Sequence, residues 1–321
     1  MPDTLKIALS SIDDVLRCVN LASLLEVSGY PKPGNIHRTI DFAETRFEHF
    51  LAGISAIQPN FRELCLRTKK CFQEEKIVYK KIRLGHFYTS AARSMMNWQQ
   101  GGNVLLGHIL ILGPLIAATN LCLIEDEKQF KSLEIYLKNI IESSTPQDTV
   151  GLYKAMDISN PGGLGKVEKY DLNDKEAIEE IRKDKVNLKK IFDLSQSYDL
   201  IASEYANNFH VILHIGLPYF LQEFESTGDI NKAVVNTFLK ILGKYPDTLI
   251  IRKSGEKAAH LVSQQANLIL EKGGISTEKG LKMAFDLDKK LQTKDGALNP
   301  GTTADIIAGI IYCGLISGIR F

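Results

Sequence analysis

The sequence shows no excess of charge of either sign. Its 321 residues carry 39 Lys and Arg side chains against 38 Asp and Glu, a formal net charge of +1 at pH 7. Broad binding to nucleic acid or to anionic membranes depends on a strong positive field, so this balance argues against both kinds of partner. With 44% hydrophobic and 24% charged residues, the chain has the composition of an ordinary globular protein with a large core.

Paired cysteines and a recognisable targeting segment are also missing. The five cysteines are scattered and form no Cys-x-x-Cys pair. We therefore expect reduced thiols in the core rather than a disulfide framework or a zinc site. The first residues lack a basic start followed by an apolar stretch, so we expect a cytoplasmic protein.

Alternating strand patterns are scarce, and residues 248–251 are the best, short candidate. Apolar residues instead recur every three to five positions, as in amphipathic helices. We expect helices at residues 15–25, 41–57 (ended by Pro59), 128–141, 175–194, 201–221, 231–242, 258–271, 277–291 and 306–319. Residues 143–174 read as a long functional loop. The prediction is an all-α, multi-helix bundle, a single domain over residues 1–321 with long site-forming loops.

One apolar run is long enough to cross a bilayer. Residues 104–124 contain no Asp, Glu, Lys or Arg. The run contains Gly113-Pro114 as well as polar residues, and no basic flank sets an orientation. We interpret it as one or two buried helices, broken near Pro114.

The segment at residues 299–305 (NPGTTAD) precedes an apolar run and has the character of a helix start. The N–H groups of such a start favour an anion, notably a phosphate, and an acidic residue beside a phosphate suits a divalent cation. The alternative is a capped core helix that binds nothing.

A second segment near the N-terminus, residues 31–35 (PKPGN), resembles the first in composition. Two prolines hold Lys32 in an extended conformation, and Gly34-Asn35 turns the chain. Lys32 is either a phosphate contact or a solvated loop side chain.

Other polar residues allow a site role and a structural role. Residues 160–166 (NPGGLGK) offer free N–H groups and a Lys but lack the spacing of a P-loop. Glu168, Asp171 and Asp174 follow at three-residue intervals and could gather around Mg²⁺, or Asp174 could cap the next helix. Asn103 could cap a helix or bind a ligand, and Asp247 with Arg252 could clamp a phosphate and a metal or form a salt bridge. Asp286 and Asp288 are expected to be solvated on an amphipathic helix.

Five of these stretches, in order, resemble the triphosphoribosyl-dephospho-CoA synthase family (ATP:dephospho-CoA triphosphoribosyl transferase). They are Glu26-Val27 with PKPGN, residues 101–107 (GGNVLLG), residues 160–168 (NPGGLGKVE), residues 246–253 (PDTLIIRK) and the PGTTADIIA that starts at Pro300. The middle three are typical of the family's shorter, archaeal-type branch. The resemblance runs from about residue 21 to residue 321.

The resemblance implies a transferase that uses ATP and 3′-dephospho-CoA. The 2′-hydroxyl of dephospho-CoA attacks the anomeric carbon of the ATP ribose, adenine leaves, and the triphosphoribosyl group is transferred. Mg²⁺ is implied by the use of ATP.

Candidate residues follow for each role. The expected catalytic residues are Glu26 as general base, Asp41 and Asp305. The expected phosphate- and substrate-binding residues are Lys32, Gly34, Asn35, Asn103, Gly163, Lys166, Arg252, Thr302 and Thr303. The expected Mg²⁺ ligands are Asp41, Glu168, Asp171, Asp247 and Asp305.

The sequence departs from the long bacterial members at one place that concerns specificity. After Asn103 those members carry Thr-His-Lys-Gly, whereas this chain has Val104-Leu105-Leu106-Gly107 and loses the cation. Two alternatives therefore remain, a related ribosyl- or phosphoryl-transferring enzyme of another cofactor pathway and a non-catalytic nucleotide-binding helical protein.

Overall fold

Helices account for nearly all the regular structure of the protein. The computed structural model describes residues 5–73, 76–162, 169–174, 176–293 and 296–321. The α-helices are α1 Ile12–Ser28, α2 Phe47–Lys69, α3 Leu84–Trp98, α4 Leu106–Ile124, α5 Phe130–Glu142, α6 Pro146–Ser159, α7 Ala177–Lys183, α8 Leu188–Ser195, α9 Leu200–Ala206, α10 Leu217–Thr227, α11 Ile230–Lys244, α12 Thr248–Ser254, α13 Glu256–Glu271, α14 Glu278–Leu291 and α15 Gly301–Ile316. Short elements complete the described structure: the strands β1 Phe72–Gln73 and β2 Lys76–Ile77, the 3₁₀ turns η1 Tyr79–Lys81 and η3 Gly274–Ser276, and the π-helix η2 Val211–Gly216. The all-α prediction is confirmed.

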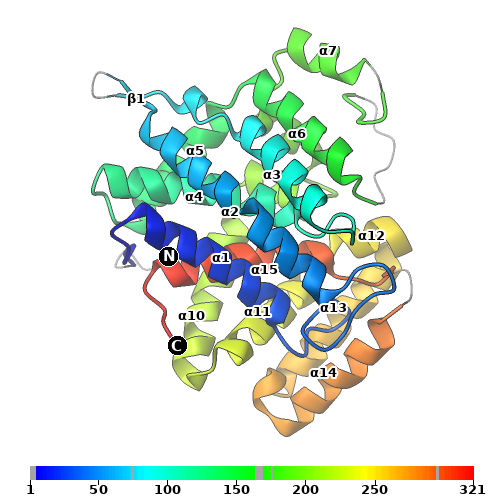
Figure 1. Ribbon diagram of the computed structural model, residues 1–321. Coiled ribbons are helices and arrows are strands. Elements are labelled where there is room, and N and C mark those ends of the chain that lie inside the picture. The colour runs from blue at the N-terminus through cyan, green and yellow to red at the C-terminus, as the bar shows by residue number, and fades with distance from the viewer. Residues whose placement is uncertain (1–4, 74–75, 163–168, 175, 294–295) are drawn as a thin grey trace.

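Two apolar helices, α4 and α15, form the centre of the molecule. α15 packs against α1, α4, α10 and α11, and Figure 1 shows it running behind α1 through the middle of the fold. α4 is the one helix among the described residues that is long and apolar enough to span a membrane, yet 89% of its most apolar window is buried inside the protein. The apolar run is therefore a core helix, and all five cysteines are buried and free, as expected.

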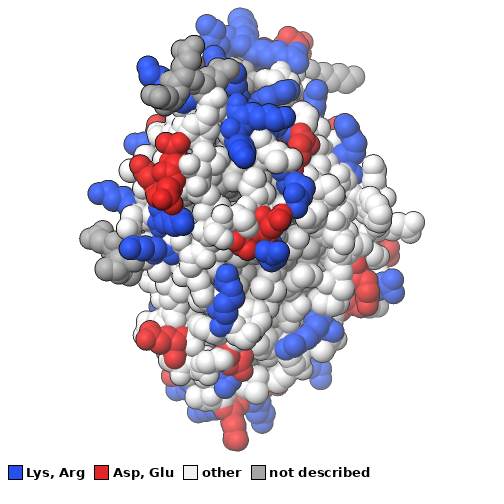
Figure 2. Space-filling view, turned by 60° about the vertical axis from the view of Figure 1, so that its left-hand side comes forward, with Lys and Arg blue, Asp and Glu red and all other residues white. Residues whose placement is uncertain are grey.

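Two groups of helices flank this centre. α2, α3 and α6 pack together in the upper part of Figure 1, where α5 packs against α4, and α10, α11, α13 and α14 pack together in the lower part. α1, α4 and α15 lie where the groups meet, and the candidate site is built from these three helices and the loops beside them. Basic and acidic side chains lie in small separate groups of both signs over the face in Figure 2, in keeping with the balanced charge of the sequence.

Both internal prolines were wrongly expected to break a helix. In α2, Pro59 and Ser55, whose carbonyl loses its helical partner, are both exposed, so water can take the place of that hydrogen bond. In α4 the carbonyl of Leu110, four residues before Pro114, accepts the buried Tyr205 hydroxyl at 2.6 Å. Each helix therefore continues through its proline.

Two other expectations about local structure were wrong. Residues 248–251 belong to helix α12, because Asp247 accepts the N–H groups of Leu249 and Ile250 as an N-cap. The expected loop at 143–174 contains α6, which begins with a reciprocal Thr145–Asp148 capping box and Pro146 in its first turn.

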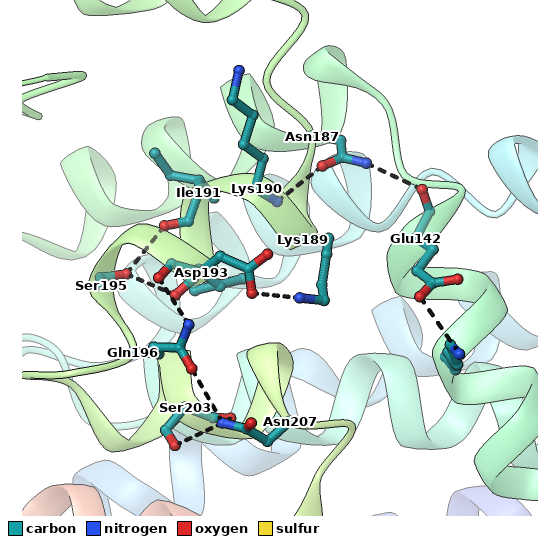
Figure 3. Close-up of polar contacts among 12 residues, drawn as sticks. Glu142, Asn187, Lys189, Lys190, Ile191, Asp193, Ser195, Gln196, Ser203 and Asn207 are labelled. Carbon is teal, nitrogen blue, oxygen red and sulfur yellow. Dashed lines mark hydrogen bonds and ion pairs between the residues drawn. The ribbon is translucent and has the colours of Figure 1, made fainter.

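The expected helix at 175–194 is two helices. The chain turns at Lys185, which has a φ of +51°, and α8 begins after Asn187. The Asn187 side chain accepts the Lys190 N–H and donates to the carbonyl of Glu142 in α5 (Figure 3). At the other end of α8, Gln196 is linked to Asn207, which follows α9. These contacts fix α8 between α5 and α9.

The expected helix at 201–221 is interrupted by a buried carboxylate. Asn208 and Phe209 have φ values of +53° and +59°, and the chain continues as η2 and α10. Glu204 is fully buried and accepts the N–H groups of Val211 and Ile212, one on each oxygen, at 2.9 Å. Burial raises the pKa of Glu204 to about 7, against the opposing effect of the two N–H donors.

Candidate active site

Four charged or titratable side chains from distant parts of the sequence meet at the junction of α1, α4 and α15. Lys32 donates from Nζ to the backbone carbonyl of Glu26 at 2.7 Å and also pairs with its carboxylate. His108 Nε2 lies 3.2 Å from Glu26 Oε2 and 3.8 Å from Asp305 Oδ1. The two sequence motifs around Lys32 and Asp305 are thereby joined through His108, and we call this group of four residues the Glu26 cluster.

Glu26 and Lys32 form a fully enclosed ion pair. Both side chains are at most 2% exposed, so Lys32 is not a solvated loop residue. Burial opposes ionisation of Glu26, but Lys32 and His108 outweigh it and hold the pKa of this carboxyl below its usual value. Burial lowers the pKa of Lys32, and Glu26 counteracts that shift.

The pKa of Asp305 is displaced in the opposite direction from that of Glu26. Burial raises its pKa to about 7, assisted by the carboxylates of Glu26, Asp247 and Asp199, while His108 opposes the rise. Its side chain nevertheless remains 22% exposed, so it can reach a bound molecule. Gly107 makes room for it, because a Cβ at that position would lie 1.9 Å from Asp305 Oδ2.

The start of α15 is occupied by a carboxylate of the protein itself. Asp247 Oδ2 accepts the Thr303 N–H at 2.7 Å and the Thr303 hydroxyl at 2.8 Å, and the Thr302 hydroxyl accepts from Thr248. The other Asp247 oxygen caps α12, and the side chain is fully buried. The position where we expected Thr302 and Thr303 to hold a phosphate is therefore taken by Asp247, which joins the starts of α12 and α15.

Arg252 pairs with Asp199 and does not clamp a ligand together with Asp247. Its guanidinium pairs with Asp199 at 2.5 Å, and both side chains are just over 20% exposed. The Arg252 Nε atom is buried and has no hydrogen-bond partner in the part of the chain that the structure describes. Because Asp199 contributes to the raised pKa of Asp305, this ion pair belongs to the surroundings of the Glu26 cluster.

The PKPGN turn is held from the C-terminal half of the chain. Asn35 donates from Nδ2 to the side chain of Asn299 at 2.8 Å, so the two predicted motifs touch directly. Gly34, with a φ of +79°, donates its N–H to Asp288. The turn thus lies beside the segment that precedes α15.

Asn103 and Asp41 both make local contacts at helix starts. Asn103 is exposed and accepts the Leu106 N–H at the beginning of α4. Asp41 is exposed and accepts the Phe47 N–H at the beginning of α2. Among the described residues, neither side chain hydrogen-bonds to a member of the Glu26 cluster.

The part of the expected loop at residues 143–174 that follows α6 contains few described candidate site residues. Gly163, Lys166 and Glu168 lie outside the described residues. Asp171 accepts the Asn173 N–H at 2.8 Å, and Asp174 accepts the Glu176 N–H at 2.9 Å just before α7, in the manner of a cap.

The described residues do not build a metal cage. Within residues 5–73, 76–162, 169–174, 176–293 and 296–321, no group of three or more His, Cys, Asp or Glu side chains is placed to hold a metal ion. The oxygens of Glu26 face Lys32 and His108, and those of Asp247 accept four hydrogen bonds. The expected set of carboxylate ligands therefore does not come together in this part of the chain.

His108 and Asp199 are site residues that the sequence did not indicate. His108 sits in an uninterrupted apolar helix, where a histidine usually packs in the core, and Asp199 reads as a helix cap, which it also is. The available signal was the position of His108 directly after Gly107, where the stretch that departs from the bacterial pattern ends.

Comparison with known proteins gives the same family along the whole chain. A family model described as ATP:dephospho-CoA triphosphoribosyl transferase matches residues 12–320. A crystal structure from Archaeoglobus fulgidus, named provisionally as a triphosphoribosyl-dephospho-CoA synthase, superimposes with a TM-score of 0.62 at 28% identity and covers 84% of this chain and 100% of that one.

Two curated relatives agree. The 2-(5″-triphosphoribosyl)-3′-dephosphocoenzyme-A synthase of Klebsiella pneumoniae is 30% identical over 105 residues, 33% of this chain and 34% of the relative, so the match spans about a third of that protein. Protein CitXG of Leuconostoc mesenteroides subsp. cremoris is 24% identical over 312 residues, 92% of this chain and 57% of that protein. The family match, the shared fold and the motifs that meet at the Glu26 cluster lead to one conclusion: the chain belongs to the ATP:dephospho-CoA triphosphoribosyl transferase family.

Proposed function

We propose that the protein transfers the triphosphoribosyl group of ATP to the 2′-hydroxyl of 3′-dephospho-CoA and releases adenine. Family membership supplies the substrates, and one observation in the structure supports the chemistry: Glu26 and Asp305 share His108 but have pKa values displaced in opposite directions. Carboxyl pairs whose surroundings separate their pKa values are typical of acid–base sites.

Asp305 is the group we assign to proton transfer. In the reaction a bond forms between the anomeric carbon and the 2′-oxygen, the bond to adenine breaks, and the hydroxyl proton must leave. Asp305 is partly exposed and has a pKa of about 7, so near neutral pH its carboxylate can accept that proton. Glu26, our first expectation for the base, is enclosed and held ionised, and we assign it to orienting His108 and Lys32.

Phosphate binding falls to the partly exposed cation beside the cluster. The Arg252 side chain is 22% exposed, and its Nε atom has no hydrogen-bond partner among the described residues. We propose that Arg252 contacts the triphosphate, while the enclosed Lys32 holds Glu26 and adds positive charge beside the site, with the turn at Gly34 and Asn35 next to it. Mg²⁺ enters as part of the Mg–ATP substrate, since the described residues supply no cage for it and Mg²⁺ is commonly held through substrate phosphates. Both substrates are small soluble molecules, and we place the reaction in the cytoplasm.

The proposal is tested by identifying the products directly. The purified chain is incubated with Mg–ATP, with and without dephospho-CoA, and every nucleoside product is identified by mass spectrometry. We expect adenine only when dephospho-CoA is present, together with a product whose mass equals the two substrates minus adenine. Release of ADP or pyrophosphate would point to a different transfer, and intact ATP in both samples would contradict the proposal.

A further inference from the structure

One face of α14 holds the turn that carries Lys32. The Asp288 side chain is only 7% exposed, contrary to the expectation that it is solvated. Its Oδ1 accepts the Gly34 N–H at 2.9 Å, and its Oδ2 lies 3.0 Å from His37 Nε2. The carboxylate therefore bridges two points of the chain, one on each side of Asn35.

Neighbouring residues on the same face of α14 also contact the segment that carries Lys32. Gln292, one turn further on, donates to the carbonyl of Asn35 at 3.2 Å and to Asp288 at 3.0 Å. Phe285, one turn earlier, packs edge-on against Tyr30 with ring centroids 5.3 Å apart. The spacing 285, 288 and 292 puts these side chains on one helix face. In Figure 1 the loop after α1 lies beside α13 and α14.

The geometry of the turn explains how the contacts of Asp288 influence the position of Lys32. The Asn35 N–H donates to the Lys32 carbonyl at 3.2 Å, which closes a four-residue turn with Pro33 and Gly34 in its centre. Proline followed by glycine with a φ of +79° is the pattern of a type II turn. Asp288 holds the N–H at the centre of this turn, two residues from Lys32, while the ammonium at the far end of Lys32 reaches Glu26.

We propose that Asp288 is a positioning residue: by binding Gly34 and His37 it fixes the PKPGN turn and thereby the Lys32 ammonium beside Glu26 and Asp305. The inference rests on the proposed function for its kinetic consequence but not for its structural one. A shift of about 1 Å in a group that orients a substrate can cost up to roughly a hundredfold in rate, so the effect of losing this grip is measurable.

Three variants test the inference. Asp288→Ala removes both contacts, Asp288→Asn keeps an acceptor for the Gly34 N–H and an amide facing His37, and Asp286→Ala changes an exposed aspartate two residues away on α14. We expect kcat to fall roughly 10- to 100-fold in Asp288→Ala and to be largely restored in Asp288→Asn. Asp286→Ala should match the wild type.

Hydrogen–deuterium exchange provides the structural readout. We expect Asp288→Ala to exchange faster in the peptide covering residues 30–40, with α4 and α15 unchanged, because only the turn loses its partner. Unchanged exchange there, or faster exchange through the whole molecule with activity falling in step, would overturn the inference. If the wild type lacks transferase activity, the proposed function fails, and the exchange of residues 30–40 alone decides the role of Asp288.

Discussion

Asp305 and Glu204 are two buried carboxyl groups whose pKa values are both raised to about 7, yet they differ in almost every other respect. Glu204 is sealed in the core, and both of its oxygens accept backbone N–H groups at the start of η2. Asp305 is 22% exposed, faces His108, and lies close against α4 where Gly107 leaves room for it. A raised pKa alone therefore does not identify a catalytic acid or base; access and a titratable neighbour do.

The strongest test of this comparison replaces the carboxylate of Asp305 with an amide. Asp305→Asn should lower kcat by roughly 10²- to 10⁴-fold, because the amide cannot accept the proton of the attacking hydroxyl. Steady-state adenine release measures the effect, with Asp286→Asn as the exposed control on α14. Full activity in Asp305→Asn would remove Asp305 from the chemistry.

Glu26 and Glu204 are both buried carboxyl groups, but Glu26 differs in having a buried cation, Lys32, beside it. Lys32→Met leaves Glu26 enclosed without its partner, and breaking a buried pair in this way should reduce the free energy of unfolding by about 3–5 kcal/mol. The exposed pair of Arg17 with Asp14 provides the control: Arg17→Met should change stability by less than about 1 kcal/mol. Urea denaturation measures both, and equal small losses would mean that the Glu26 pair contributes little.

Replacing Glu204 should reduce stability and leave activity unchanged, the reverse of what we expect for Asp305. Glu204→Ala leaves the N–H groups of Val211 and Ile212 without acceptors, at a cost of about 2–4 kcal/mol in the free energy of unfolding. Activity per folded molecule should stay near that of the wild type when assayed well below Tm. A variant that keeps its stability but loses kcat would assign Glu204 a part in the reaction.

The pH dependence of stability tests the raised pKa of Asp305. A carboxyl whose pKa is raised on folding binds its proton more tightly in the folded state, so its contribution to stability falls as pH rises from about 4 to about 7. For Asp305, partly exposed, this loss should be on the order of 2 kcal/mol. Between pH 5 and pH 8 the Asp305→Asn variant should therefore lose less stability than the wild type. An identical loss in both proteins would show that Asp305 titrates normally.

The pH dependence of the rate should follow Asp305 and not Glu204. If Asp305 accepts the proton, kcat/KM should rise about tenfold per pH unit below pH 7 and level off above it. Glu204→Gln should leave that profile unchanged. A profile that moves with Glu204→Gln would place the titrating group in the core instead.

Turn chemistry in the sequence located much of the candidate site. Lys32 and Asp305 were singled out from Pro-Gly turns at opposite ends of the chain, and both motifs lie at the Glu26 cluster. Sequence reasoning could not reveal which groups satisfy each other: Asp247 fills the start of α15, and Asp288 reaches Gly34 across most of the chain length. Such pairings depend on tertiary packing.

The fold class followed from helical periodicity, but several boundaries did not. The apolar stretch at 248–251 was too short for periodicity to distinguish a strand from a helix, and its Asp247 cap decided the outcome. The two prolines failed to end their helices because water in one case and Tyr205 in the other can replace the missing donor.

Because α15 carries Asp305 and packs against α1, the first and last helices of the described chain must meet before the site exists. On the ribosome, α1 emerges long before α15, and at about 5–20 residues per second the interval is tens of seconds or less. During that time α1 lacks its main partner and α4 lacks one of its partners, so the nascent chain is a natural client for chaperones. A chain cut short before α15 would be an inactive fragment with an exposed core, which proteases can remove before it binds any nucleotide.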